Sequence, residues 1–355
     1  MSARRTALLL ALALLAGGCA DRAPAPAEGF AGLGGEREGF ARVVPGKAFA
    51  FPADHGAHPD FRIEWWYLTA NLRDADGRDY GVQWTLFRNA LRPAADAPGW
   101  GNGNLWMGHA GMTTRDRHWS AQRMARGGVG QAGVVAVPFQ AWIDDWSLQG
   151  DPAGELRARA RGDGFGYRLR LQADGPLVLQ GEQGFSRKSG GGQASYYYSQ
   201  PFFRADGVLD IDGREVEVTG MAWMDREWSS QPLAADQVGW DWFSLHFDDG
   251  RRLMLFRLRH ADGGDYLSGN WIAPDGRTTP LGAGDIRLRP LRTTRVADRD
   301  VPTRWALALP GHELQVQVEA INPDAWMDLD TAYWEGPVRV TGSAGGVGYL
   351  EMTGY

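Results

Sequence analysis

The sequence predicts an all-β protein, and two features of the chain support this prediction. Apolar side chains alternate with other residues in short segments, and turn signals that contain glycine separate these segments. A period of two places successive side chains on opposite faces of a strand, whereas helical spacing of apolar residues is scarce here. Short strands that end in regular turns indicate a sandwich or a barrel.

The alternating segments and the turns follow one another along the chain. The alternating positions are Tyr80, Val82, Trp84 and Leu86, then Tyr167, Leu169 and Leu171, then Val216 and Val218, and finally Leu314, Val316 and Val318. The turn signals are Asp76-Gly77, Asp212-Gly213, Asp249-Gly250 and Asp275-Gly276. Glycine suits these turns because it tolerates the positive φ that tight hairpins need.

The N-terminus has the pattern of an export signal with a lipid-attachment site. Arg4 and Arg5 precede an apolar run over 7–15, which is too short to span a bilayer and is typical of a signal-peptide core. Small residues lead from this run into Cys19, the only cysteine of the chain, as in signals whose cysteine is acylated after cleavage. A lone cysteine cannot form an internal disulfide. We therefore predict lipidation of Cys19, and ordinary secretion with a coincidental cysteine is the alternative.

The residues around this cysteine also predict where the protein resides. An inner-membrane retention signal would place Asp after the cysteine, but this position holds Ala20. We therefore expect a periplasm-facing lipoprotein, held in the outer membrane rather than the inner membrane. Its membrane contact would be the N-terminal lipid anchor.

The chain divides into four parts in this interpretation. A signal peptide (1–18) and a lipidated flexible tether (19–45) precede two domains (46–232 and 233–355). The tether is rich in Ala, Pro, Gly and charge, so it cannot bury enough apolar surface to fold. About 310 residues remain after it, which is more than one hydrophobic core usually supports.

A weak internal repeat indicates that the two domains are alike. The segment 64–68 (EWWYL) opens a hairpin that turns at Asp76-Gly77 and returns through 82–87. The segment 241–245 (DWFSL) opens a hairpin that turns at Asp249-Gly250 and returns through 253–258. Each hairpin begins with an acid, a tryptophan and a second aromatic residue. We interpret the repeat as two similar β-barrels, and chance similarity between two aromatic hairpins is the alternative.

Charge and motif content argue against several function classes. The formal net charge is -6, and removal of Arg4 and Arg5 changes it to -8; without a basic run, this argues against a nucleic-acid partner. The chain lacks G-x-S-x-G, H-E-x-x-H, a Walker loop and G-x-G-x-x-G after a strand, so we predict no cofactor. His55 and His58 are spaced like metal ligands, but their Pro- and Gly-rich surroundings favour a surface loop, and we predict no metal site.

The tryptophans suggest a pocket for an apolar ligand. The chain has 16 of them, and indoles bury large apolar areas and line ligand pockets. Those that lie in or beside the segments richest in carboxylates are Trp65, Trp66, Trp84, Trp223, Trp228, Trp240 and Trp242. For any single tryptophan, a place in the barrel core is the alternative. Their clustering with acids makes a pocket the interpretation for the group.

The segment 220–232 contains the strongest candidate for chemistry. Asp225 and Glu227 alternate along a strand end and therefore project to one face, with Trp223 beside them. A carboxyl group against indoles is poorly solvated, so its pKa should rise and suit it to donate a proton. The alternative is structural: Arg226 or another arginine pairs with these acids and the cluster ties the domains together.

Several short motifs resemble a known family when they are taken in order. They are 64–67 (EWWY), 195–199 (SYYYS), 223–232 (WMDREWSSQP), 239–243 (GWDWF), 333–338 (YWEGPV) and the terminal 348–355 (GYLEMTGY). Together they resemble the AttH-like branch of the carotenoid 1,2-hydratase (hydroxyneurosporene synthase) superfamily, from about residue 45 to the C-terminus. The resemblance implies two lipocalin-like β-barrel domains in tandem. Members of this exported branch are often labelled secreted hydrolases, a label that no motif here supports.

The resemblance also implies an activity and a set of residues. Carotenoid hydratases protonate a terminal isoprenoid double bond and capture the cation with water, without a cofactor. Their His-x-Trp pair falls on Tyr196-x-Tyr198, where the histidine is lost, and their Tyr-x-Asp pair resembles Trp223-x-Asp225. With the acids and tryptophans singled out above, the candidate catalytic residues are Asp225, Glu227, Tyr196, Tyr198 and Trp223, and the candidate ligand-binding residues are Glu64, Trp65, Trp66, Trp228, Trp240 and Trp242.

Two functions remain open at this point. One is a cofactor-free, acid-catalysed hydration or isomerisation of an apolar isoprenoid or polyene in a tryptophan-lined cavity between two barrels, with Asp225 as the acid. The other is a carrier that binds a lipid or another apolar compound in the same cavity without chemistry. The lost histidine favours the carrier, whereas Asp225 and Glu227 favour the enzyme. A structural or transport accessory role at the outer membrane is a third possibility.

Overall fold

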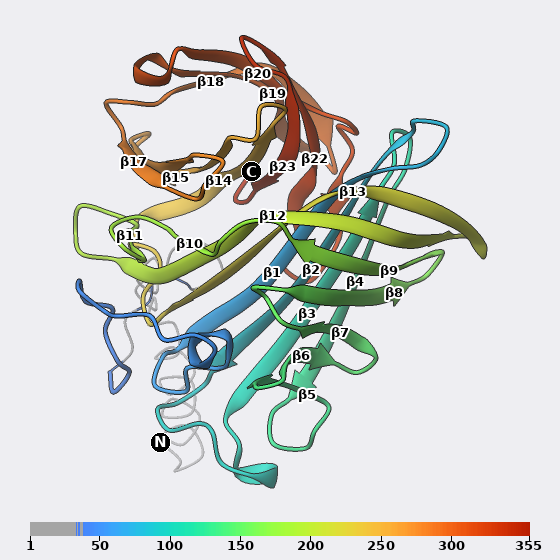
Figure 1. The fold of residues 1–355 in the computed structure, drawn as a ribbon. Helices are drawn as coiled ribbons and strands as arrows, with labels where there is room; N and C mark the ends of the chain where they lie inside the picture. The colour runs from blue at the N-terminus through green and yellow to red at the C-terminus, as the bar shows by residue number, and fades with distance from the viewer. Residues whose placement is uncertain (1–32, 34, 36–37) are drawn as a thin grey trace, which may run out of the picture.

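The computed structural model describes residues 33, 35 and 38–355, and within them the chain is all-β, as the sequence predicts. Figure 1 shows a large sheet that curls into a nearly closed barrel and a second sheet that forms a half-open barrel above it. Short 3-10 turns are the only helical segments of the described part: η2 (Ala53–His55), η3 (Gly99–Gly101) and η4 (Pro310–His312). No helix in this part is both long and apolar enough to cross a membrane.

The first sheet has 13 strands, and all of its pairings are antiparallel. The strands are β1 (Ile63–Arg73), β2 (Asp79–Ala90), β3 (Asn104–Thr113), β4 (His118–Arg126), β5 (Ala132–Ala136), β6 (Phe139–Ile143), β7 (Trp146–Gly150), β8 (Glu155–Gly162), β9 (Phe165–Ala173), β10 (Val178–Leu179), β11 (Phe185–Arg187), β12 (Ala194–Ile211) and β13 (Arg214–Ser229). Their spatial order is β4-β3-β2-β1-β13-β12-β9-β8-β7-β6-β5, with β10 and β11 paired to β12. The edge strand β4 packs against β6 and β8, which brings the two ends of the sheet together.

The second sheet has 10 strands and begins after the linker that follows Ser229. The strands are β14 (Gln237–Phe247), β15 (Arg252–His260), β16 (Asp265–Ile272), β17 (Thr278–Gly282), β18 (Arg287–Val296), β19 (Arg299–Leu309), β20 (Leu314–Ala320), β21 (Trp326–Met327), β22 (Tyr333–Gly342) and β23 (Gly346–Met352). Their order is β17-β16-β15-β14-β23-β22-β20-β19-β18, with β21 paired to β22. The edge strands β17 and β18 are not paired with each other, which leaves this barrel half open.

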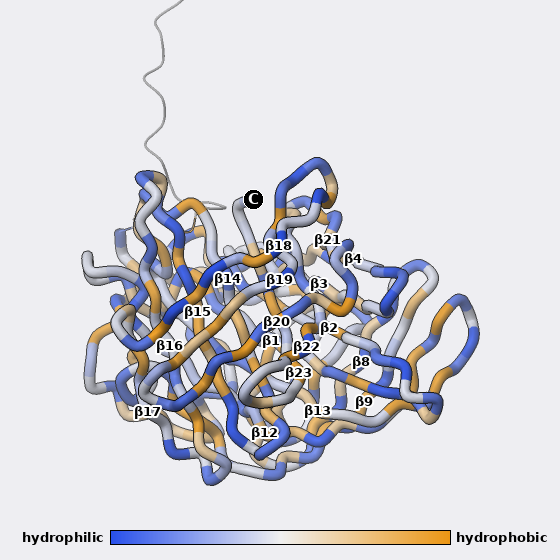
Figure 2. The backbone as a smooth tube through the Cα atoms, turned by 90° about the horizontal axis from the view of Figure 1, so that it is seen from above, coloured by the Kyte–Doolittle hydropathy of each residue, from blue (hydrophilic) through white to orange (hydrophobic). Residues whose placement is uncertain are grey.

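Side-chain alternation explains how these segments form strands. Along β8, Leu156, Ala158 and Ala160 are buried while Arg157 and Arg159 are exposed, so one face packs on the barrel core and the other meets water. Figure 2 shows hydrophobic and hydrophilic residues intermixed in this way along the strands of both sheets. Each barrel has its own buried apolar core.

A third core joins the two sheets. β1 packs on β23 and β2 packs on β22, and the buried side chains between them include Tyr67, Tyr197, Trp223 and Tyr349. The side-chain amide of Asn71 donates a 2.8 Å hydrogen bond across this interface to the carbonyl oxygen of Gly348. Strands at this interface are buried on both faces, and they carry the site described below.

The segment before β1 corrects one prediction. His55 and His58 do not lie in a surface loop: His55 is 3% exposed, and its Nδ1 is 2.6 Å from the hydroxyl of Tyr198. The ring of His58 stacks on Trp228 with 3.8 Å between centroids. The Pro- and Gly-rich segment folds back into the mouth of the first barrel because Phe49 and Phe51 pack there with Tyr198.

Candidate functional site

The interface cavity lies between the two sheets and has a volume of about 280 Å³. Its walls come from β1, β2, β3, β12 and β13 of the first sheet and from β14, β15, β22 and β23 of the second. Many of the lining residues are aromatic: Trp65, Tyr67, Phe87, Tyr197, Trp240, Trp242, Phe256 and Tyr333. Three carboxyl groups also line it: Asp225, Glu227 and Glu351.

Strand β13 places Asp225 and Glu227 in the cavity. Alternation along β13 sends Asp225 and Glu227 to the interface, and it sends Arg226 into the first barrel. The neighbouring strand β1 runs antiparallel, with Tyr67 opposite Asp225 and Trp65 opposite Glu227. The expected pairing of these acids on one face beside indoles is therefore present in the structure.

Asp225 accepts three hydrogen bonds, and no cation of the described part of the chain forms an ion pair with it. The donors are the hydroxyl of Tyr197 at 2.8 Å, the hydroxyl of Ser199 at 2.5 Å and the indole Nε1 of Trp223 at 2.7 Å. Burial raises the pKa of Asp225 to about 7, although these three hydrogen bonds act in the opposite direction. A carboxyl group with this pKa is partly protonated at neutral pH.

Glu227 has a different environment from Asp225. The ammonium nitrogen of Lys188 lies 2.8 Å from its Oε1, and the hydroxyl of Ser195 donates to the same oxygen. The Lys188 ammonium also lies 4.3 Å from the ring centroid of Phe256 and 5.1 Å from that of Tyr197. The cavity thus already holds one ammonium group, between a carboxylate and two aromatic faces.

Glu351 is the carboxyl group that the second sheet contributes. The indole Nε1 of Trp240 donates to its Oε1 at 2.5 Å. Burial, together with the charges of Asp225 and Glu227, raises the pKa of Glu351 to about 7, although the hydrogen bond from Trp240 acts in the opposite direction. Among the described residues, no Lys, Arg or His lies within ion-pair distance of Glu351.

The two halves supply equivalent pairs of side chains to the interface cavity. In the first half, Trp65 on β1 stands opposite Glu227 on β13. In the second half, Trp242 on β14 stands opposite Glu351 on β23. The hairpins that carry the two tryptophans are the ones that the internal repeat singled out.

The repeat extends to a buried ion pair in each hairpin. Glu64 faces Arg88 across β1 and β2, and the Arg88 Nε donates to it. Asp241 faces Arg257 across β14 and β15 at the same hairpin position, and the Arg257 Nε donates to it at 2.7 Å. Both acids point into their own barrels, whereas the tryptophans that follow them point into the interface cavity.

Two hydrogen-bonded pairs involve residues of another wall of the cavity. The hydroxyl of Tyr67 donates to Glu335, and the hydroxyl of Tyr333 lies 3.1 Å from Nδ1 of His109. Burial raises the pKa of Glu335 well above its usual range, with Glu351 adding to the effect. Burial lowers the pKa of His109 to about 4, so this imidazole is neutral at physiological pH.

Several predicted site residues lie elsewhere. Tyr196 and Tyr198 were expected to face the same cavity as Asp225, but they point into the first barrel, and Tyr197 between them faces the interface cavity. Trp66 and Trp228 also pack in the first barrel. The reason is the strand period: a shift of one residue moves a side chain to the opposite face of the sheet.

Glu64 is an anchor inside the first barrel rather than a part of the cavity. Its carboxylate is fully buried between the guanidinium groups of Arg88 and Arg226, and the backbone N–H of His58 also donates to it. Burial opposes ionisation, but Arg226 and Arg88 hold the pKa of Glu64 far below its usual range. The Arg226 guanidinium lies 3.8 Å from the ring centroid of Trp66. Arg226 thus pairs with Glu64, not with Asp225 or Glu227.

Of the predicted residues, the structure brings Asp225, Glu227, Trp65, Trp240 and Trp242 together in the interface cavity, and Trp223 donates to Asp225 from the same interface. Sequence reasoning missed five polar residues of this region: Lys188, Tyr197, His109, Glu335 and Glu351. Glu335 and Glu351 lie in motifs that carried the family resemblance, which was the available signal. Lys188 and His109 had none, because each lies far in sequence from its partners.

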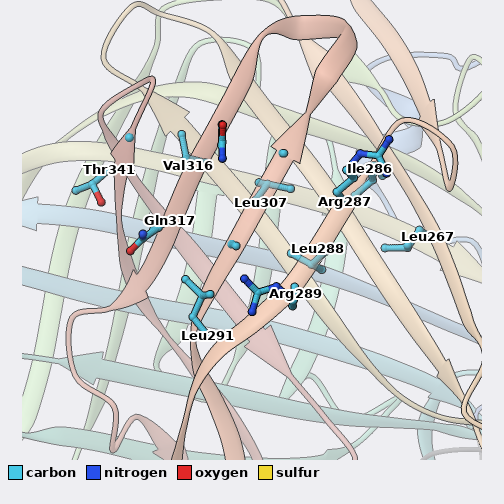
Figure 3. Close-up of a pocket in the computed structure, with 14 residues that line it drawn as sticks. Leu267, Ile286, Arg287, Leu288, Arg289, Leu291, Leu307, Val316, Gln317 and Thr341 are labelled. Atoms are coloured by element: carbon cyan, nitrogen blue, oxygen red, sulfur yellow. The ribbon is translucent and has the colours of Figure 1, made fainter.

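A second hollow lies on the second sheet and has a volume of about 770 Å³. Figure 3 shows leucines of β16, β18 and β19 around it, with Arg287 and Arg289 at its side. Its lining residues include no Asp, Glu, His or Cys, so they offer no proton donor near neutral pH. Nor do the described residues gather three or more His, Cys, Asp or Glu that could hold a metal ion.

Comparisons with known proteins agree with this architecture. The family model described as AttH-like matches residues 42–355. The crystal structure of an AttH protein (NE1406) from Nitrosomonas europaea is 36% identical, with a TM-score of 0.79, and the match covers 89% of this chain and 100% of that one. Kievitone hydratase from Nectria haematococca shares the fold at 14% identity, with a TM-score of 0.67 over 89% of this chain and 96% of that one. Among curated proteins, none matches.

Proposed function

The chain belongs to the AttH-like family, and from this premise we propose that it acts on an apolar isoprenoid or polyene in the interface cavity by cofactor-free, acid-catalysed hydration or isomerisation. The observation that carries the proposal is Asp225, a buried carboxyl group without a cation partner, which faces an aromatic cavity. The fold shared with a protein named as a hydratase supports the reaction class.

The first step is proton transfer from Asp225 to a carbon of the double bond. The two π electrons form the new C–H bond, Asp225 becomes a carboxylate and the neighbouring carbon becomes a cation. The three hydrogen bonds from Tyr197, Ser199 and Trp223 stabilise the carboxylate as it forms. The faces of the aromatic lining residues stabilise the positive charge on the substrate.

The second step distinguishes hydration from isomerisation. In hydration, a water oxygen forms a bond to the cation, and the proton that it must lose passes to a neutral base. His109 fits this role because its pKa of about 4 leaves the imidazole unprotonated at neutral pH. The imidazolium then gives up this proton and the Asp225 carboxylate, with its higher pKa of about 7, takes one up, which restores both groups for the next turnover. In isomerisation, a neighbouring C–H proton returns to the Asp225 carboxylate instead, and the double bond forms at a new position.

The size of the interface cavity restricts the substrate. Its volume of about 280 Å³ lies just below the range of small-molecule sites, about 300–1,000 Å³. A long polyene would therefore place only its reacting end in the cavity. The half-buried rings of Trp65 and Trp240 border the opening.

Labelled water tests this function directly. Apolar compounds that co-purify with the native protein would be identified by mass spectrometry and incubated with it in ¹⁸O-labelled water. We expect a product that contains one labelled oxygen, or an isomer of unchanged mass, and no product with Asp225→Asn. Turnover by Asp225→Asn at the wild-type rate would contradict the assignment of the acid.

A carrier function is the second candidate, and the lining of the cavity favours it. A cavity with many aromatic side chains in its lining can bind an apolar ligand without any need for chemistry. The labelled-water experiment separates the two candidates, because a carrier would release the co-purified compound unchanged with either form of residue 225.

The location of the protein is part of the same proposal. Cys19, its signal peptide and most of its tether lie outside the described residues, and we propose that Cys19 is acylated and holds the protein at the outer membrane, facing the periplasm. Radiolabelled palmitate should enter the wild type but not Cys19→Ser. Equal labelling of the two proteins would show that Cys19 is not the attachment site.

A further inference from the structure

The two halves of the interface cavity differ in one respect: one carboxylate has a cation partner and its counterpart does not. Glu227, opposite Trp65, holds the ammonium of Lys188 at 2.8 Å. Glu351 occupies the equivalent register position opposite Trp242, and no cation of the described residues pairs with it. An ammonium group therefore lies at the carboxyl group of one half, and none of the described residues places one at its counterpart in the other half.

The region around Glu351 is rich in carboxyl groups. Its indole donor, Trp240, occupies one carboxylate oxygen, and Asp225 lies close enough to raise its pKa. Glu335, directly opposite Glu351 on β22, is a further buried acid, and its Oε2 has no hydrogen-bond partner among the described residues. The cavity and the strands beside it thus place four carboxyl groups against one lysine.

Buried carboxylates without a cation are expensive, and two responses relieve the cost. The acids can take up protons, or a cation can bind between them. Aromatic faces attract alkylated ammonium groups through the ring quadrupole, and they bury the alkyl substituents at the same time. The rings of Trp240 and Trp242 lie beside Glu351 and meet both requirements.

We propose that the interface cavity binds an organic cation, an alkylated ammonium group on an apolar chain, with its charge at Glu351 in the position that Lys188 takes at Glu227. The inference rests on the proposed function in one respect, that the interface cavity is the ligand site. The inference adds the substrate class, an apolar molecule whose end in the cavity carries a positive charge. The protonated alkene of the proposed reaction carries such a charge transiently.

The charge state of the cavity sets the pH dependence of binding. The titratable groups around Glu351 and Asp225 are Lys188, Glu227, Tyr67, Tyr197, His109, Tyr333 and Glu335. Burial raises the pKa of both Glu351 and Asp225 to about 7, whereas burial keeps His109 neutral down to about pH 4. Between pH 6 and 8 the cavity therefore gains negative charge, and a permanent cation should bind more tightly as pH rises.

Octyltrimethylammonium is a suitable probe, because its charge does not titrate. Its binding to the whole protein would be measured by calorimetry at pH 6 and pH 8, with 1-octanol as the neutral probe and octanoate as the anionic probe of equal chain length. We expect the cation to bind at least about tenfold more tightly than 1-octanol at pH 8, and more tightly at pH 8 than at pH 6. Octanoate should bind most weakly.

Two variants connect this binding to Glu351. Glu351→Gln should weaken octyltrimethylammonium about tenfold and leave 1-octanol unchanged. Glu217→Gln removes an exposed carboxylate from the far end of β13 and should change neither probe. Thermal melts of both variants would show that each is folded.

The outcomes separate this inference from the proposed function. If 1-octanol binds and the cation binds no better, the cation site is wrong and an apolar ligand remains supported. If the cation binds at least about tenfold more tightly than 1-octanol, the inference stands, and the labelled-water experiment alone decides the proposed reaction. If neither probe binds, the interface cavity is not the ligand site and both proposals fail.

Discussion

The carboxyl group of Asp225 shows how burial without a counter-ion changes the chemistry of one residue. Its three hydrogen-bond donors are neutral, so they reduce the cost of the charge but do not cancel it. Moving the pKa from 3.8 to about 7 corresponds to about 4 kcal/mol of difference between the protonated and charged forms on folding. Asp225 therefore makes its full contribution to stability at pH values below its pKa in the unfolded chain. This contribution is lost as the pH rises through its folded-state pKa of about 7.

The variant Asp225→Asn isolates this effect. Because Asn does not titrate, the wild type should lose up to about 4 kcal/mol of unfolding free energy relative to the variant between pH 4 and pH 8. Denaturant unfolding of both proteins across this range measures the difference. A difference that stays constant with pH would mean that Asp225 is ionised throughout. Glu217→Gln, on the same strand but exposed, serves as the control.

Glu64 illustrates the opposite case, a buried acid that is fully paired. Replacing it by Gln leaves Arg88 and Arg226 buried without a counter-charge, and we expect a loss of about 3–5 kcal/mol of unfolding free energy. The matched control is Glu215→Gln, which breaks an exposed pair with Arg168 and should cost less than about 1 kcal/mol. Equal losses in the two variants would argue against the anchor role of Glu64.

At the scale of single strands, β12 determines which tyrosine meets the site. Residues 195–199 are all buried, and the strand packs on the first barrel with one face and on the interface with the other. No polar face therefore shows which residues of β12 point to which side of the sheet. For this reason, the sequence alone does not tell whether Tyr197 or its neighbours Tyr196 and Tyr198 face the interface cavity. Where one face meets water, as along β8, the pattern predicts the orientation correctly.

A pair of variants on β12 tests this assignment. Tyr197→Phe removes a hydrogen bond to charged Asp225, so the pKa of Asp225 should rise further. Tyr198→Phe removes the contact with His55 in the first barrel and should leave that pKa unchanged. The chemical shift of the Asp225 carboxyl carbon, followed against pH, would measure this pKa in both variants. If the pKa of Asp225 changes more in Tyr198→Phe than in Tyr197→Phe, then Tyr198 faces the interface cavity and the assignment is wrong.

The hairpins mark how far prediction from the sequence extends. The turns at Asp76-Gly77 and Asp249-Gly250 and the tryptophans that begin each hairpin are local signals, and they lie where the sequence predicts. The pairing of β13 with β1 joins residues that lie between 146 (Arg73 with Thr219) and 166 (Ile63 with Ser229) positions apart, and no local pattern reports it. The acids that β13 brings to the candidate site were therefore predictable from the sequence. The residues that β14, β22 and β23 contribute from the second sheet were predictable only in part.

At the scale of the whole molecule, close packing between the two sheets holds the cavity together. Gly81 on β2 faces the second sheet, where an added Cβ atom would lie 2.6 Å from Cγ of Pro337 and 2.8 Å from the hydroxyl oxygen of Tyr349. Only a residue without a side chain fits this approach. The distance between the walls of the interface cavity thus depends on a contact made outside it.

Gly81→Ala should separate the sheets slightly and destabilise the protein by about 1–3 kcal/mol. Gly190→Ala is the matched control, because a Cβ atom at that position meets nothing within 4 Å. Thermal unfolding measures both. If the two variants unfold at the same temperature, the two sheets can move apart without cost and the interface is not closely packed.

The division of the site between the two halves has a consequence for how such proteins can diversify. Asp225 and Glu227 come from the first sheet, and Glu351 and its indole partners come from the second, so neither half alone encloses a cavity. A recombination event that exchanged one barrel with that of a relative would join an acid from one lineage to a wall from another. The ligand preference of this architecture is therefore inherited as a unit, and new specificities must arise by paired substitutions on strands that lie more than a hundred residues apart in the chain.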